Sequence, residues 1–157
     1  MNVKELITLI DVESNEIVDE QSEYIQYVNH AIDTLSMILV TIRDREVVKN
    51  TNIADNAPVP TDFMAFVPKS GYPVRILGNV FKTYDGTPVN EVFYSIRKNH
   101  IDTFDDTIPF SEFFHSYLVQ MVSFLVKKKS LMTEYASFDK SYIDYMTELI
   151  KSARGIA

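Results

Sequence analysis

A long apolar stripe near the start of the chain most constrains its fold. Between Val18 and Ile42, apolar residues recur at alternating spacings of three and four, which is the repeat of one helix face. The stripe consists of Val18, Ile25, Val28, Ile32, Leu35, Leu39 and Ile42. The pattern predicts a long helix from about Glu16 to Val48 that packs against other helices, with Ile32 and Leu35 at its centre.

Three further helices are expected. Asn2 and Glu5 have the spacing of a capping box at the start of a short helix over residues 2–10. Asp106 and Pro109 mark the start of a helix that ends at the three lysines of residues 127–129. A last amphipathic helix is expected from about Ser137 to Ala153, with Gly155 as its stop signal.

The middle of the chain has a different pattern. Residues 50–62 are rich in Asn, Asp and Pro, which break helices and favour turns. Strands are expected at 63–67, 74–77, 80–84 and 91–97, with tight hairpin turns at Gly78-Asn79 and Asp85-Gly86.

These elements predict one domain over residues 1–157 of the α+β class, mainly α. The expected architecture is an antiparallel helical bundle with an inserted small antiparallel β-hairpin region. The helices occupy about 2–50 and 107–154, and the hairpin arm occupies about 62–98.

The sequence contains no recognisable catalytic or cofactor motif. The histidines His30, His100 and His115 lie in three different elements and lack metal-site spacing. The four glycines of the chain are too widely spaced to form a phosphate-binding loop. No serine stands in a nucleophile motif. Asp102, Asp105 and Asp106 could bind a cation, but a capping role explains them better. We therefore expect no catalytic residues, no metal, no cofactor and no enzyme activity.

The charge distribution argues against a surface that binds nucleic acid tightly. The 157-residue chain has a net charge of −7, and residues 11–23 contain six acids and no base. Lys127 to Lys129 fit the negative end of a helix. The chain has no cysteine, which fits synthesis in a reducing cytoplasm, and no apolar run approaches the roughly 20 residues of a membrane span. We expect no contact with a membrane.

Three segments together resemble one protein family. They are Pro58-Val-Pro-Thr-Asp-Phe-Met64 after the long helix, Tyr94-Ser-Ile-Arg97 in a strand, and Ile108-Pro-Phe-Ser-Glu-Phe-Phe-His-Ser-Tyr-Leu118 at the next helix. This combination resembles the head-to-tail adaptor family of tailed phages, often called tail tubular protein A in short-tailed phages. The resemblance covers the order of elements along nearly the whole chain.

The resemblance implies a structural subunit of a ring, commonly of twelve copies, that joins the portal to the tail and lines the DNA exit channel. The implied partners are other copies of the chain, the portal protein and the next tail or nozzle protein, with DNA passing through the lumen without specific binding. The implied location is the neck or tail of the virion, after synthesis in the bacterial host cytoplasm. The alternatives are another neck component, such as a stopper or tail-completion protein, or a non-enzymatic helical interaction or regulatory domain.

Two segments are the candidate assembly surfaces. The hairpin arm is expected to contact a neighbouring subunit or the next tail component, and the basic C-terminus is expected to dock on the portal. The candidate interface residues are Val74, Arg75, Gly78, Asn79, Phe81, Tyr84, Lys151, Arg154 and Ile156.

Overall fold

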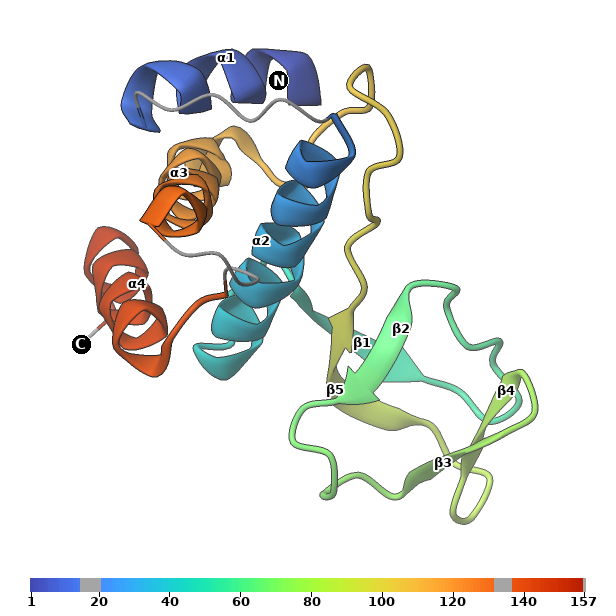
Figure 1. The fold of residues 1–157 in the computed structure, drawn as a ribbon. Coiled ribbons are helices and arrows are strands. Elements are labelled where there is room, and N and C mark those ends of the chain that lie inside the picture. The colour runs from blue at the N-terminus through green and yellow to red at the C-terminus, as the bar shows by residue number, and fades with distance from the viewer. Residues whose placement is uncertain (15–20, 132–136, 157) are drawn as a thin grey trace. The chain divides into compact units, whose positions relative to one another are not determined.

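The computed structural model describes residues 1–14, 21–131 and 137–156 (Figure 1). The chain forms two compact units. The helical unit comprises residues 1–38 and 98–157, and the strand unit comprises residues 39–97. The boundary between them falls inside the longest described helix.

The elements follow one another as helices, strands and helices (Figure 1). The helices are α1 (Val3–Ser14), α2 (Gln21–Thr41), α3 (His115–Leu131) and α4 (Lys140–Ala153), with a 3-10 turn, η1 (Glu112–Phe114), before α3. The strands are β1 (Val48–Ile53), β2 (Phe63–Phe66), β3 (Val74–Leu77), β4 (Val80–Thr83) and β5 (Val89–Ile96).

The helical unit has its core where the apolar faces of the helices meet. Ile32 and Leu35 are fully buried, as the stripe predicts. Leu118, Met121 and Leu125 are buried on α3. The capping box at the start of α1 is confirmed, because the Asn2 backbone N–H donates to the Glu5 carboxylate and the Glu5 N–H donates to the Asn2 side-chain oxygen.

The strand unit contains two antiparallel sheets. One has the order β1-β5-β2, and β3 and β4 form the other. Ile53, Phe81 and Val92 are buried at the centre of this unit, and the rings of Phe63 and Phe66 pack against Phe81. The many aromatic residues of the middle segment therefore build a core of their own.

The expected architecture, a helical bundle with a small inserted hairpin region, is wrong. The described residues contain five strands in two sheets, so the fold is α+β with a substantial strand unit. The main reason is β1, which occupies residues that we expected to end a helix or form a loop. Its Val48 and Ile53 are buried, and the strand pairs with β5 along its length.

The second hairpin is also absent from the described structure. After β4 the chain does not turn back onto it, since β5 pairs with β1 and β2 instead. Asp85 closes the intervening turn by accepting hydrogen bonds from the N–H and hydroxyl of Thr87. These bonds lower the pKa of the Asp85 carboxyl.

Several helix boundaries differ from the expectation, since α1 continues to Ser14, α3 to Leu131, and α4 begins at Lys140. Two further differences have a clear structural cause. α2 ends at Thr41, not Val48, because the backbone at Arg43 turns into the left-handed region with a φ of 54°. After Asp106, helical structure begins only with η1 at Glu112 and α3 at His115, since the Asp106 carboxylate instead accepts the N–H groups of Asp102 and Thr103 and closes a turn. The expected start of the long helix at Glu16 lies outside the described residues.

Candidate interaction surface

The β3–β4 hairpin lies where the sequence predicted strands at 74–77 and 80–84. Its strands are joined by Gly78 and Asn79, and Gly78 has a φ of 64° that a two-residue hairpin turn requires. The register places Leu77 opposite Val80 and Arg75 opposite Lys82.

The hairpin has two chemically different faces because side chains alternate along a strand. Its inner face carries Phe81 and Thr83, which are 3% and 8% exposed. Its outer face carries Leu77 and Tyr84, which are 57% and 92% exposed. Arg75 and Lys82 share this outer face. We call Arg75, Leu77, Lys82 and Tyr84 the hairpin surface.

The backbone of β4 holds the hairpin to the rest of the strand unit. Phe81 N–H donates to the Ala57 carbonyl at 2.8 Å, and Asn56 N–H donates to the Phe81 carbonyl at 2.9 Å. The opposite edge, along β3, has no strand beside it in the described part of the chain. An open edge of this kind is a ready template for pairing with another chain.

The charged residues of the hairpin surface form an unusual pair. Arg75 and Lys82 are directly opposite each other across two antiparallel strands, where like charges are destabilising. Both line a hollow of about 310 Å³ together with Tyr72 and Tyr84. Lys82 also donates to the side-chain oxygen of Asn56.

Not all of the predicted hairpin residues belong to this surface. Arg75 and Tyr84 do, Gly78 and Asn79 form the turn, and Val74 is partly buried. Phe81 is enclosed in the core of the strand unit. Sequence reasoning missed Leu77 and Lys82, although the alternation that places 75 and 77 on one face of a strand could have identified them.

The predicted C-terminal residues lie in the helical unit, apart from the hairpin in the sequence. The Arg154 guanidinium stacks over the Phe113 and Phe114 rings, at 4.2 and 4.9 Å from their centroids. Lys151 pairs with the Glu148 carboxylate at 3.5 Å. Ile156 is 40% exposed, and its N–H donates to the Lys151 carbonyl beyond Gly155.

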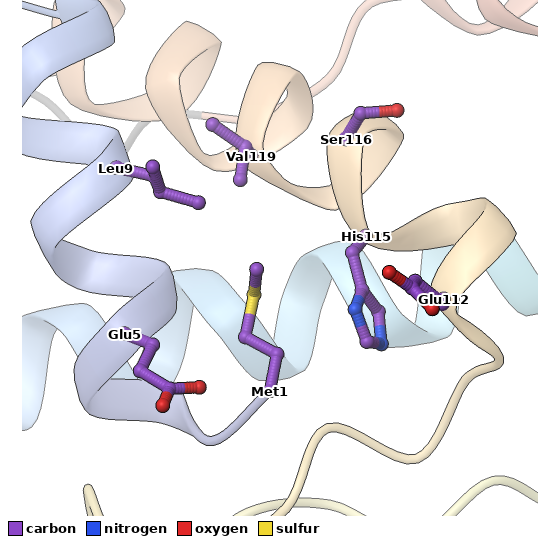
Figure 2. A pocket seen from close by; sticks show the side chains of 7 residues that line it. All are labelled: Met1, Glu5, Leu9, Glu112, His115, Ser116 and Val119. Atoms are coloured by element: carbon purple, nitrogen blue, oxygen red, sulfur yellow. The ribbon is translucent and has the colours of Figure 1, made fainter.

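A second hollow, of about 550 Å³, lies between α1 and the start of α3 within the helical unit (Figure 2). His115 and Ser116 both line it, but their side chains point in opposite directions in Figure 2. The His115 ring is bound through Nε2 to the Phe110 carbonyl at 3.0 Å, and the Glu5 carboxylate caps α1. This arrangement does not pair a nucleophile with a base.

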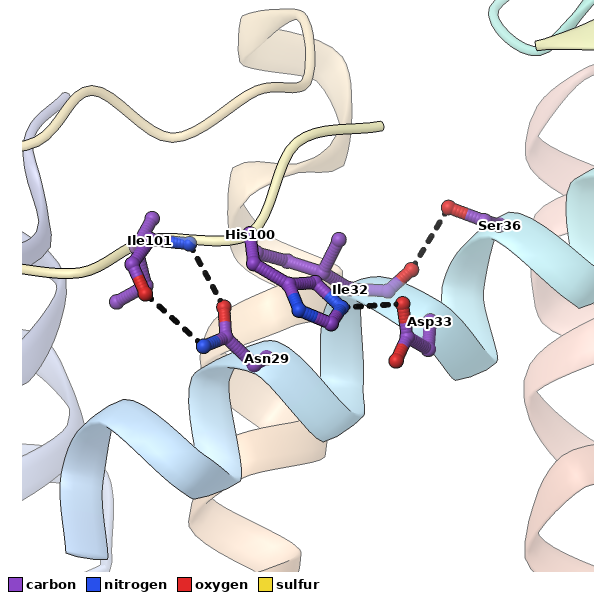
Figure 3. A network of polar contacts seen from close by, with 6 residues as sticks. All are labelled: Asn29, Ile32, Asp33, Ser36, His100 and Ile101. Atoms are coloured by element: carbon purple, nitrogen blue, oxygen red, sulfur yellow. Dashed lines mark hydrogen bonds and ion pairs between the residues drawn. The ribbon is translucent and has the colours of Figure 1, made fainter. Parts of the chain in front are cut away.

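A polar network attaches the segment after the strand unit to α2 (Figure 3). The Asn29 side chain donates to the Ile101 carbonyl at 3.0 Å and accepts from its N–H at 2.8 Å. His100 pairs with Asp33 at 2.8 Å. The two Asn29 bonds satisfy backbone groups of an irregular segment, so this part of the network has a structural explanation.

Three other basic residues that the sequence analysis considered have structural partners. Lys128 binds the Ser137 carbonyl at 2.9 Å, and Lys129 pairs with Glu23. The His30 ring stacks on Phe138. Within the described ranges, no group of three or more His, Cys, Asp or Glu side chains is placed to hold a metal ion.

None of the described helices has the length and apolar character needed to cross a membrane. The sequence matches no known family of proteins, and a search of curated proteins finds no match either.

Proposed function

We propose that this chain is a structural subunit of the head-to-tail adaptor ring of a tailed phage, and that it acts by assembly and not by catalysis. Its partners are other copies of the chain, the portal protein and the next tail component, and DNA passes through the lumen of the ring. The subunit is made in the cytoplasm of the bacterial host and works in the neck of the virion.

The observation that carries this proposal is the hairpin surface. An anchored β-hairpin presents Leu77 and Tyr84 to solvent beside two cations. Tyrosine and arginine, both present on this surface, are enriched at protein interfaces and among the residues that contribute most of the binding energy. A surface of this kind suits a protein that makes the same contact many times in an assembly.

The family resemblance supplies the kind of assembly. The segment Pro58–Met64 leads into β2, and Ile108–Leu118 runs through η1 into α3. Both segments stand at the entrances to elements, and this placement is what supports the comparison with that family. The resemblance also implies a helical bundle with a hairpin extension, and the observed fold differs from it by its strand unit. The proposal therefore rests on these segments, on the order of the elements and on the hairpin surface.

The proposal is tested by mixing the purified chain with the purified portal protein of the phage that encodes it. Sedimentation velocity should report a complex, and electron microscopy should reveal a ring of subunits on one end of the portal. A chain that remains a monomer and does not bind portal would contradict the proposal.

A matched pair of variants tests the role of the hairpin. The double variant Leu77→Ser, Tyr84→Ser should lose assembly while keeping the circular dichroism spectrum of the unchanged protein. Met64→Ser is the control, because Met64 is 53% exposed in the same unit but lies on β2. Equal assembly by all three proteins would show that another surface makes the contact.

A further inference from the structure

The hairpin surface and the charge of the helical unit point to a specific contact between copies. We propose that the hairpin surface binds the acidic helical unit of a second copy of this chain, with Arg75 and Lys82 meeting carboxylates of the neighbour. This inference rests on the proposed function as a ring subunit and names the partner of its hairpin.

The hairpin carries positive charge that no ion pair among the described residues compensates. Arg75 and Lys82 face each other across β3 and β4, and no described acidic side chain forms an ion pair with either. Asp55, on the neighbouring loop, is engaged by the Thr83 N–H and the Asn56 side chain. Two like charges at this spacing repel each other, and an external carboxylate would relieve that repulsion.

The backbone of the hairpin is already held in one conformation before any partner binds. The hydrogen bonds of β4 to residues 56–59 and the burial of Phe81 hold the backbone in place. Binding therefore orders few groups, which lowers the entropic cost of association. Leu77 and Tyr84, on either side of the cations, offer apolar area that a partner can cover.

Charge is divided unequally between the two units. The strand unit contains seven basic and six acidic residues, a net charge of +1. The helical unit contains the other eight basic and sixteen acidic residues, a net charge of −8. Two helical units repel each other, whereas the hairpin of one copy attracts the helical unit of the next.

A contact between two different surfaces of identical chains can repeat head to tail, and it forms a ring when the rotation closes. The charge division favours contact of the hairpin with a helical unit over contact between two helical units, and the ring follows from the proposed function. It also disfavours a DNA phosphate as the occupant, because a chain with a net charge of −7 repels nucleic acid.

Crosslinking from the hairpin turn identifies the partner directly. The chain has no cysteine, so Asn79→Cys creates a single attachment point for a photoactivatable crosslinker beside the hairpin surface. Mixing ¹⁴N-labelled and ¹⁵N-labelled chains lets mass spectrometry distinguish links between copies from links within one copy. We expect links between copies that end in residues 1–38 or 98–157. Links that end in the strand unit of the neighbour would overturn the proposal.

Charge reversal tests the energetic role. The double variant Arg75→Glu, Lys82→Glu should weaken self-association by about tenfold or more, and Arg75→Lys, Lys82→Arg should retain it. Lys69→Glu, at an exposed lysine of the same unit, is the control for net charge and should change association little. Self-association of the unchanged protein should weaken as salt rises. Association that is insensitive to salt and to the double reversal would refute the electrostatic contact.

Two outcomes separate this inference from the proposed function. If the double reversal still forms rings on the portal, the contact between hairpin and helical unit is refuted and the adaptor proposal stands. If the unchanged protein neither self-associates nor binds portal, both fall. Binding of a DNA duplex that depends on Arg75 and Lys82, without links between copies, would reassign the surface to nucleic acid.

Discussion

Arg43 holds a backbone conformation that usually belongs to glycine. Its φ is 54°, its N–H donates to the Val40 carbonyl at 3.0 Å, and the next N–H, of Asp44, donates to the Leu39 carbonyl at 2.8 Å. This pair of bonds is the Schellman arrangement that ends a helix. For a residue with a Cβ, the left-handed conformation costs about 1–2 kcal/mol.

The first prediction follows from that strain. Arg43→Gly should raise the free energy of unfolding by about 0.5–1 kcal/mol, because glycine adopts the conformation freely but loses more backbone entropy on folding. Urea denaturation would measure the change. Arg43→Ala removes the same side chain and keeps the Cβ, so it should give no such gain. An equal gain in both variants would assign the effect to the side chain.

Tyr142 has a strongly shifted ionisation. It stacks on Phe124 at a centroid distance of 3.9 Å and on Phe138 at 5.5 Å. Burial, and then the charge of Tyr145, raise the pKa of Tyr142 to about 12. The folded state therefore holds this proton more tightly than the unfolded chain, in which a tyrosine ionises near pH 10.

The second prediction is a loss of stability in alkali. The contribution of Tyr142 is fully present below pH ~10 and is lost as the pH rises toward 12, since the unfolded state releases the proton first. Tyr142→Phe cannot ionise, so its stability should fall less between pH 10 and pH 12. The exposed Tyr84→Phe is the control and should follow the unchanged protein. Parallel pH profiles for all three proteins would contradict this account.

At the level of elements, α2 forms because its apolar residues make one continuous face. Tyr24, Val28, Ile32 and Leu35 are all at most 4% exposed, while Met37 on the other side is 52% exposed. Burial of one face stabilises a helix of this length more than its intrinsic propensity does.

The third prediction concerns this face. Ile32→Asp should lower the free energy of unfolding by several kcal/mol, because it buries a carboxylate without a partner. Met37→Asp, on the exposed side of the same helix, should change stability by less than about 1 kcal/mol. Thermal melts of the two variants would compare them, and equal melting temperatures would refute the burial of Ile32.

The hairpin contributes to the core of the strand unit on one face and offers the hairpin surface on the other. Removing residues 78–87 would test it crudely, because the deletion includes Phe81 and would open the core of the strand unit. Substitutions at Leu77 and Tyr84 leave that core intact. Substitutions on the outer face therefore separate a loss of assembly from a loss of folding, which the deletion cannot do.

At the scale of the whole molecule, charge is unevenly distributed. The helical unit has a net charge of −8 and the strand unit +1. Repulsion among its negative charges therefore destabilises the folded helical unit, whereas the strand unit has no such excess. Salt shortens the range of that repulsion from about 30 Å at 0.01 M to about 8 Å at 0.15 M.

The fourth prediction is that salt stabilises the two units unequally. Raising the ionic strength from about 0.01 M to about 0.15 M should increase the hydrogen-exchange protection of Leu35 and Leu118. Protection of Val92, in the strand unit, should change little. Equal changes at all three amides would show that the charge division does not govern stability.

The candidate surface was predictable in part. Gly78-Asn79 between two short apolar runs is a local signal, and the turn and both strands of the hairpin stand where that signal placed them. The burial of Phe81 was not predictable, because the core it joins is assembled from Ile53 and Val92 on strands distant in the sequence.

Sequence alone determined the features that depend on near neighbours in the chain. These are the buried face of α2, the capping box of Asn2 and Glu5, the hairpin turn, and the end of α4 before Gly155. Each depends on a helical or strand repeat, or on a bond between residues a few positions apart.

Only the tertiary structure decided the size of the strand unit and the end of α2. β1 exists because its residues pair with β5, some 40 positions later in the chain, and no local pattern specifies that partner. Arg43 terminates the helix although its side chain does not favour the left-handed conformation, so no sequence signal marked the stop. Contacts between distant segments outweigh local preference at both places, and they turn the expected hairpin arm into a unit with its own core.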